Sequence, residues 1–81
     1  MQITDVEIDD RNETHVTRHG ISLAEIVQVF ANDPDVRRNR ADRAGTHVAR
    51  GRTNGGRRGL IPFVDKGAGR VRPIAAWEEG K

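Results

Sequence analysis

The most regular hydrophobic pattern of the chain lies between residues 21 and 34. Apolar side chains recur there at intervals of three and four residues, at Leu23, Ile26, Val27 and Phe30. This spacing predicts a helix with one buried face. Ser22 and Glu25 have the spacing of a capping box, in which each side chain accepts the other residue's backbone amide. The helix is expected to end before Pro34, because a residue that precedes proline avoids the helical region.

The residues before this helix carry weaker signals. Asp9 or Asp10 can cap a second helix over roughly 10–19, and Gly20 is placed to end it. Its apolar content is low, and its coherent stripe consists of Asn12, His15, Val16 and His19. In the opening segment 2–8 the isoleucines are out of phase, so any strand there is weak.

Three strands are predicted in the second half, over 46–53, 60–65 and 70–77. The turn-forming segments Asn54-Gly55-Gly56 and Lys66-Gly67-Ala68-Gly69 separate them. The polar stretch 36–44 has no core face. Helices followed by antiparallel strands predict an α+β fold, with two N-terminal helices packed on a small antiparallel β-sheet. At 81 residues the chain is expected to form a single domain over 1–81.

Prolines interrupt the last two predicted strands and constrain their pairing. A four-residue loop over 66–69 would place Asp65 opposite Arg70, and therefore Pro62 opposite Pro73. Each proline removes a backbone donor from the sheet. We therefore expect one or both strands to lie at a sheet edge or to carry a bulge.

Charge is distributed unequally along the chain, although the net charge is only +2. Residues 1–35 hold two arginines and eight acidic residues, whereas residues 36–81 hold twelve basic and four acidic residues. In the predicted strand 46–53, alternation places Arg50 and Arg52 on the same face as Val48. In the predicted strand 70–77, it places Arg70 and Arg72 on the same face as Ile74. Arginine's planar fork suits phosphate, so these four are candidate phosphate ligands. A solvated sheet face in an arginine-rich protein explains the same composition. Trp77 is the one candidate platform for base stacking, although a lone tryptophan near a C-terminus is more often a packing residue.

Several other chemistries lack support in the sequence. Without cysteine there is no disulfide, thiolate metal site or cysteine nucleophile. His15 and His19 have no third ligand at convincing spacing, so neither a metal nor another cofactor is expected. His47 or His19 could carry a proton, although His47 faces away from Arg50. The chain has no apolar run long enough to span a bilayer and no signal-peptide pattern at its start, which favours the cytoplasm.

Four segments in the same order carry a resemblance to a known family. The chain contains Arg18-His19-Gly20-Ile21-Ser22, Asp33-Pro34, Gly59-Leu60-Ile61-Pro62-Phe63-Val64 and Arg70-Val71-Arg72-Pro73-Ile74-Ala75-Ala76. Together they resemble the BrnT family of type II toxins over roughly residues 8–77. The final family motif ends in Ala-Arg, whereas this chain has Ala76-Trp77.

The resemblance implies a RelE-like α+β fold and a metal-independent endoribonuclease toxin held inactive by a cognate antitoxin. Arg72 matches the first arginine of the terminal motif, which makes it the first candidate catalytic residue. Arg50 and His47 are the further candidates. RNA phosphate is then expected on Arg50, Arg52, Arg70 and Arg72. The expected partners are RNA and an antitoxin protein and not a membrane, with a homo-oligomer or a hetero-oligomer both left open. The alternative function is a non-catalytic module that binds nucleic acid or belongs to a regulatory complex. The third hypothesis is an interaction protein whose arginines are incidental.

Overall fold

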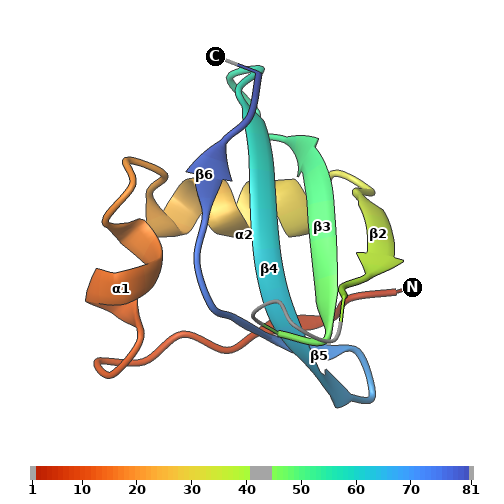
Figure 1. Ribbon diagram of the computed structural model, residues 1–81. Coiled ribbons are helices and arrows are strands. Elements are labelled where there is room, and N and C mark those ends of the chain that lie inside the picture. The colour runs from red at the N-terminus through yellow and green to blue at the C-terminus, as the bar shows by residue number, and fades with distance from the viewer. Residues whose placement is uncertain (1, 41–44, 81) are drawn as a thin grey trace.

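A computed structural model describes residues 2–40 and 45–80 of the chain. Its elements follow one another in the order β1 (Asp5–Val6), α1 (Glu13–Thr17), α2 (Leu23–Ala31), β2 (Asp35–Arg38), β3 (His47–Arg52), β4 (Arg58–Gly67), β5 (Arg70–Pro73) and β6 (Trp77–Glu78). The described strands form one six-stranded sheet in the order β1-β5-β4-β3-β2, and β6 pairs with β4 beyond the end of β5 (Figure 1).

The predicted architecture of two N-terminal helices packed on a small antiparallel sheet, RelE-like, is wrong. The described sheet is mixed, because β1 runs parallel to β5, and the two described helices are only five and nine residues long. α1 is also shorter than the predicted 10–19. β1 leaves little hydrophobic pattern in the sequence because backbone hydrogen bonds hold it in the sheet. One of these is the bond that the amide of Glu7 donates to the carbonyl of Val71, at 2.7 Å.

α2 is the element that the sequence specifies best, and its capping box and helix are confirmed. Val27, which was predicted on the buried face, is exposed, and Val29 is buried instead. The Ser22 hydroxyl accepts the amide of Glu25 and the Glu25 carboxylate accepts the amide of Ser22, both at 3.1 Å. The helix lies behind β3, β4 and β6 in Figure 1 and packs against β3 and β4. The side chains of the core are contributed by both layers, at Val16, Ile21, Ile26, Val29, Phe30, Ala49, Ile61, Phe63, Val71 and Ala76. At its centre the rings of Phe30 and Phe63 meet edge to face, with centroids 5.3 Å apart.

The hairpin of β4 and β5 has a different register from the predicted one. Pro73 lies opposite Phe63, not Pro62, because the turn contains only Ala68 and Gly69 and the pairing shifts at a bulge between Asp65 and Gly67. Ala68 and Gly69 have φ values of 55° and 81°, the positive values that a two-residue hairpin turn requires. The expected bulge is therefore present, but neither strand is at the sheet edge.

Pro62 occupies a central strand at a place where its missing donor costs little. Its carbonyl accepts the amide of Ile74 at 2.9 Å. In an extended strand the amide and carbonyl of one residue point to the same side, so the absent N–H faces the same flank. Pairing on that flank changes there from β5 to β6. The proline therefore lies where the ladder is already interrupted.

β2 begins one residue before the polar stretch 36–44, which was expected to lack a core face. Val36 packs against the core while Asp35, Arg37 and Arg38 are exposed, so the strand has a single inward side chain. It pairs with β3 along its whole length. Residues 41–44 of the same stretch lie outside the described residues.

Candidate nucleic-acid interface

One face of the sheet is covered by α2, and no described helix lies over the other (Figure 1). Because side chains alternate along strands, residues opposite one another across the ladders share a face. The side chains that this rule and the register place on the open face are Val48, Arg50, Arg52, Arg58, Leu60, Pro62, Val64, Arg72 and Trp77. Arginines and apolar groups thus share one surface, which we call the open face.

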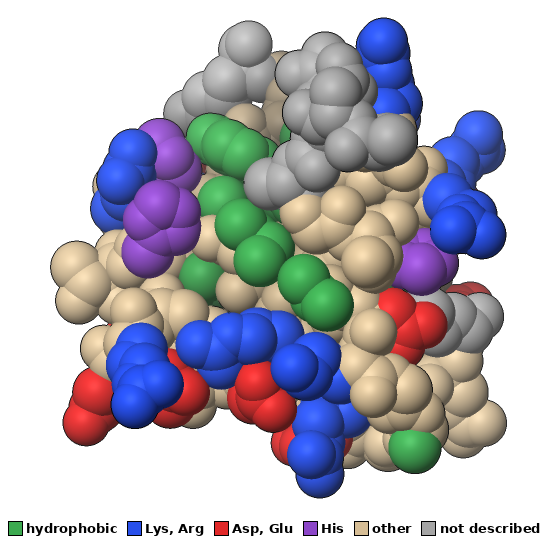
Figure 2. Space-filling view, turned by 60° about the horizontal axis from the view of Figure 1, so that its bottom comes forward, with side chains coloured by type: hydrophobic (Ala, Val, Ile, Leu, Met, Phe, Trp, Pro, Cys, Tyr) green, Lys and Arg blue, Asp and Glu red, His purple; other side chains and the backbone are tan. Residues whose placement is uncertain are grey.

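Arg72 and Arg70, two of the predicted phosphate ligands, are paired with acidic residues near the N-terminus. Arg72 Nη1 lies 3.0 Å from Glu7 Oε1 and 3.2 Å from Asp9 Oδ2, and its side chain is only 25% exposed. Arg70 Nε lies 3.3 Å from Asp5 Oδ2. Figure 2 shows basic and acidic side chains side by side on one face of the molecule, below a strip of hydrophobic ones. Part of the acidic half of the chain therefore neutralises part of the basic half.

The pairing also changes the acidity of these groups. A hydrogen bond from Arg72 is the main cause that lowers the pKa of Asp9, aided by the backbone amide of Arg11. In return, hydrogen bonds to Asp9 and then Glu7 raise the pKa of Arg72. Arg72 is thus held as a cation between two carboxylates, and a phosphate would have to displace them.

Arg57 links three parts of the chain and has a structural role. Its Nη1 donates to both carboxylate oxygens of Glu25 at 2.9 and 3.0 Å and to the carbonyl of Gly20 at 3.2 Å. Its Nη2 donates to Glu78 at 3.0 Å. Hydrogen bonds to Glu78 and Glu25 raise the pKa of Arg57. The start of α2 is therefore tied to the end of the sheet.

These ion pairs predict acid sensitivity. The amide of Ser22, and then the guanidinium of Arg57, lower the pKa of Glu25 below its ordinary 4.5. A lowered pKa in the folded state gives stability that is complete above the ordinary value and is lost as the pH falls through the folded value. We expect the urea midpoint to be constant from neutral pH down to about 5 and to fall below about 4.5.

The control for this titration is an exposed glutamate. Glu25→Gln should reduce the acid-induced loss, because that variant no longer has the carboxylate to protonate. Glu13→Gln should titrate like the unchanged protein, since the Glu13 side chain has no ion pair among the residues that the structure describes. Identical acid profiles for all three proteins would contradict this account.

Arg52 and Arg58 differ from the other arginines of the open face. They lie directly opposite each other on β3 and β4, and neither guanidinium makes a hydrogen bond or ion pair with any described residue. Beside them Arg50 Nε lies 3.0 Å from Glu79 Oε2. A shallow depression is lined by Arg50, Gly51, Arg52, Arg58 and Glu79. Like charges opposite each other in a sheet are unfavourable, so this end carries positive charge that an external anion would balance.

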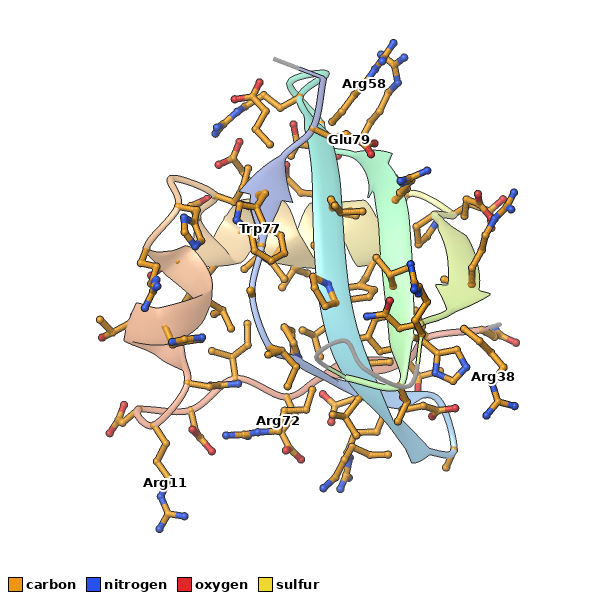
Figure 3. The ribbon with its side chains drawn as sticks, viewed as in Figure 1. Arg11, Arg38, Arg58, Arg72, Trp77 and Glu79 are labelled. Carbon is orange, nitrogen blue, oxygen red and sulfur yellow. The ribbon has the colours of Figure 1, made fainter. Side chains whose placement is uncertain are left out.

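Trp77 lies on the open face beside this arginine cluster. It is opposite Leu60, whose neighbour on the other side is Arg50, so the three form one row across the sheet. The indole is 39% exposed and stacks on the imidazole of His19, with ring centroids 5.4 Å apart and planes at 28°. Figure 3 shows Trp77, Glu79 and Arg58 on the upper part of the sheet and Arg72 at its lower edge.

The predicted catalytic set of Arg72, Arg50 and His47 is not brought together. His47 lies on the helix-facing side, where its ring stacks on Phe63 at 5.7 Å and its Nδ1 contacts Thr46 Oγ1 at 2.9 Å. It is three residues from Arg50 along β3, or about 10 Å, and on the opposite face of the sheet. Of the predicted phosphate ligands, Arg50 and Arg52 are together, and Arg70 and Arg72 are elsewhere.

Two members of the cluster were not predicted as site residues. Arg58 falls between the predicted strands 46–53 and 60–65, whereas in the structure it opens β4 opposite Arg52. The turn closes because the amide of Thr53 donates to the carbonyl of Arg57 at 2.9 Å and the amide of Arg57 donates to Thr53 Oγ1 at 3.1 Å. The glycines at 55 and 56 were the signal for that hairpin. Glu79 lies beyond the last predicted strand, and no sequence pattern marks it.

Comparisons with other proteins identify no relative of this chain. No family model matches the chain, and neither the curated proteins nor the solved structures give a match. Within residues 2–40 and 45–80, no group of three or more histidine, cysteine or acidic side chains could hold a metal ion. No helix in the same residues is long and apolar enough to cross a membrane.

Proposed function

We propose that this protein acts on RNA in the cytoplasm as the toxin of a type II toxin–antitoxin pair. The observation that carries the proposal is the cluster of Arg50, Arg52 and Arg58, in which two guanidiniums have no anionic partner among the described residues. The resemblance of residues 8–77 to BrnT toxins supports RNA as the polyanion and an antitoxin as the protein partner. The phosphate site of this proposal is the arginine cluster rather than Arg72.

The open face offers the groups that metal-independent RNA cleavage requires. In that reaction the RNA 2′-hydroxyl gives its proton to a water molecule and attacks the neighbouring phosphorus to form a 2′,3′-cyclic phosphate. The P–O bond to the next nucleotide breaks, and the leaving 5′-oxygen takes a proton. Guanidiniums of Arg52 and Arg58 would stabilise the negative charge that develops on the phosphate. His19, stacked on Trp77, is the histidine adjoining this surface and would supply the proton as an imidazolium.

A non-catalytic RNA-binding module is the second candidate. It is favoured by the ion pairs of Arg72, which hold the first predicted catalytic residue against Glu7 and Asp9. Under this alternative the arginine cluster binds phosphate and no bond is broken.

Incubation of the purified protein with RNA in EDTA separates the two candidates. The toxin proposal expects cleavage that His19→Ala reduces, whereas His15→Ala leaves it unchanged. His15 is the matched control because it is an exposed histidine on α1 without a ring contact in the described part of the chain. Salt-sensitive binding without cleavage would support the module. If the protein neither binds nor cleaves the RNA, both candidates are contradicted.

A further inference from the structure

We infer that the ligand of the open face is single-stranded RNA, with one base stacked on Trp77 and adjoining phosphates on the arginine cluster. The inference rests on the proposed function and adds a substrate class to it. It requires an accessible aromatic ring, cations within reach of that ring, and a reason for a single strand to fit better than a duplex or an acidic protein.

The aromatic ring is Trp77. Trp77 remains 39% exposed, so part of its surface is open to solvent. The ring stacks on the imidazole of His19, which is itself an exposed side chain. Trp77 and Val27 are the two large hydrophobic side chains exposed in the described residues, and Val27 lies on α2, away from the arginines. An exposed indole is the kind of surface on which bases stack.

The cations lie close to this ring. Neighbouring strands are about 4.8 Å apart, so Arg50, two strands from Trp77, has its backbone about 10 Å away. Arg58 is two residues from Leu60 along β4, or about 7 Å. The long arginine side chains can therefore reach phosphates beside a base that stacks on Trp77. The Glu79 carboxylate, which pairs with Arg50, is the acidic group inside the cluster. Arg52 and Arg58 would make the first contacts.

Stacking selects a single strand. The bases of a duplex are stacked on one another, and their faces are not available to a side chain, whereas a single strand can present an unstacked base. An acidic protein segment could pair with the arginines but has no base to place on the indole. The combination of an indole with unpaired guanidiniums is typical of surfaces that bind single-stranded nucleic acid.

Tryptophan fluorescence tests the inference directly, because Trp77 is the only tryptophan and the chain has no tyrosine. The probes are a single-stranded RNA oligonucleotide, the duplex of the same sequence, inorganic polyphosphate and poly-glutamate. We expect single-stranded RNA to quench Trp77 as it binds. Polyphosphate should bind in a salt-dependent manner with little quenching, the duplex should bind more weakly than the single strand, and poly-glutamate should bind most weakly.

Variants separate stacking from phosphate binding. By anisotropy of labelled RNA, Trp77→Ala should weaken single-strand binding about 5- to 150-fold, the usual contribution of one stacked base. Trp77→Phe keeps a ring and should lose less, and Val27→Ala, which removes the other exposed apolar side chain, should lose nothing. Polyphosphate affinity should be the same in all of them. Circular dichroism of each variant checks that it folds.

Three results would overturn the inference. They are equal affinity for single strand and duplex, equal loss of RNA and polyphosphate binding in Trp77→Ala, and poly-glutamate binding as tightly as RNA. The first would leave phosphate binding at the arginines intact. By contrast, an Arg52→Ala/Arg58→Ala double variant with unchanged affinity for RNA and polyphosphate would contradict the proposed function itself.

Discussion

The double variant Arg52→Ala/Arg58→Ala is expected to bind single-stranded RNA at least about tenfold more weakly, since two charge-assisted contacts to phosphate are lost. The logarithm of the binding constant should also fall less steeply with the logarithm of salt concentration. Each phosphate neutralised on a single strand contributes about 0.7 to that slope, so the double variant should lose about 1.4. Titrations at three or more salt concentrations measure both quantities.

A second double variant controls for charge alone. Arg11 and Arg38 are exposed, have no ion pair among the residues described, and lie far from Arg58 in Figure 3. Arg11→Ala/Arg38→Ala removes the same net charge as the test variant. Its salt slope should stay close to that of the unchanged protein. Equal losses in the two double variants would mean that RNA responds to net charge and that the arginine cluster has no special role.

Phe63→Ala is expected to remove a large part of the stability of the domain. Phe63 is fully buried, contacts Phe30 edge to face and supports the His47 ring. Truncation of a buried phenylalanine costs about 3–5 kcal/mol. A chain of this length is expected to have a free energy of unfolding of about 4–12 kcal/mol. Urea unfolding followed by circular dichroism should show a large fall in the midpoint or a chain that no longer folds.

The exposed residue Val27 provides the control for this variant. Val27→Ala removes apolar atoms from a side chain that is 48% exposed, so its effect should stay within about 0.5 kcal/mol. A Phe63→Ala protein as stable as Val27→Ala would show that the Phe30–Phe63 contact is not the centre of the core.

The sequence was most informative where side-chain periodicity and local capping determine the structure. The capping box of Ser22 and Glu25 and the helix that follows it formed as predicted. The edge strand β2 was missed and β1 was expected only as a weak strand, because both depend on backbone pairing with distant residues. β1 is two residues long, and β2 has only Val36 as an inward side chain. Such elements leave almost no pattern, and they turn the expected small antiparallel sheet into a mixed six-stranded one.

The candidate site was predictable in part for a similar reason. Strand alternation placed Arg50 and Arg52 on one face, and the register of β3 with β4 agrees with it. The state of Arg72 was not predictable, because its partners Glu7 and Asp9 lie 65 and 63 residues earlier in the chain. The unequal charge of the two halves showed that acidic residues of the first half could pair with arginines of the second, but not which arginines would be paired. The fold determines which arginines form ion pairs, and Arg52 and Arg58 have no such partner within the described residues.

The central claim is that RNA binds at the arginine cluster and Trp77 and not at Arg72. The most direct measurement is a nuclear magnetic resonance titration with single-stranded RNA that follows the arginine Nε–H and tryptophan Nε1–H signals. The account predicts that the signals of Arg50, Arg52, Arg58 and Trp77 shift, while those of Arg70 and Arg72 stay in place. Shifts confined to Arg70 and Arg72, or an absence of shifts at saturating RNA, would contradict it.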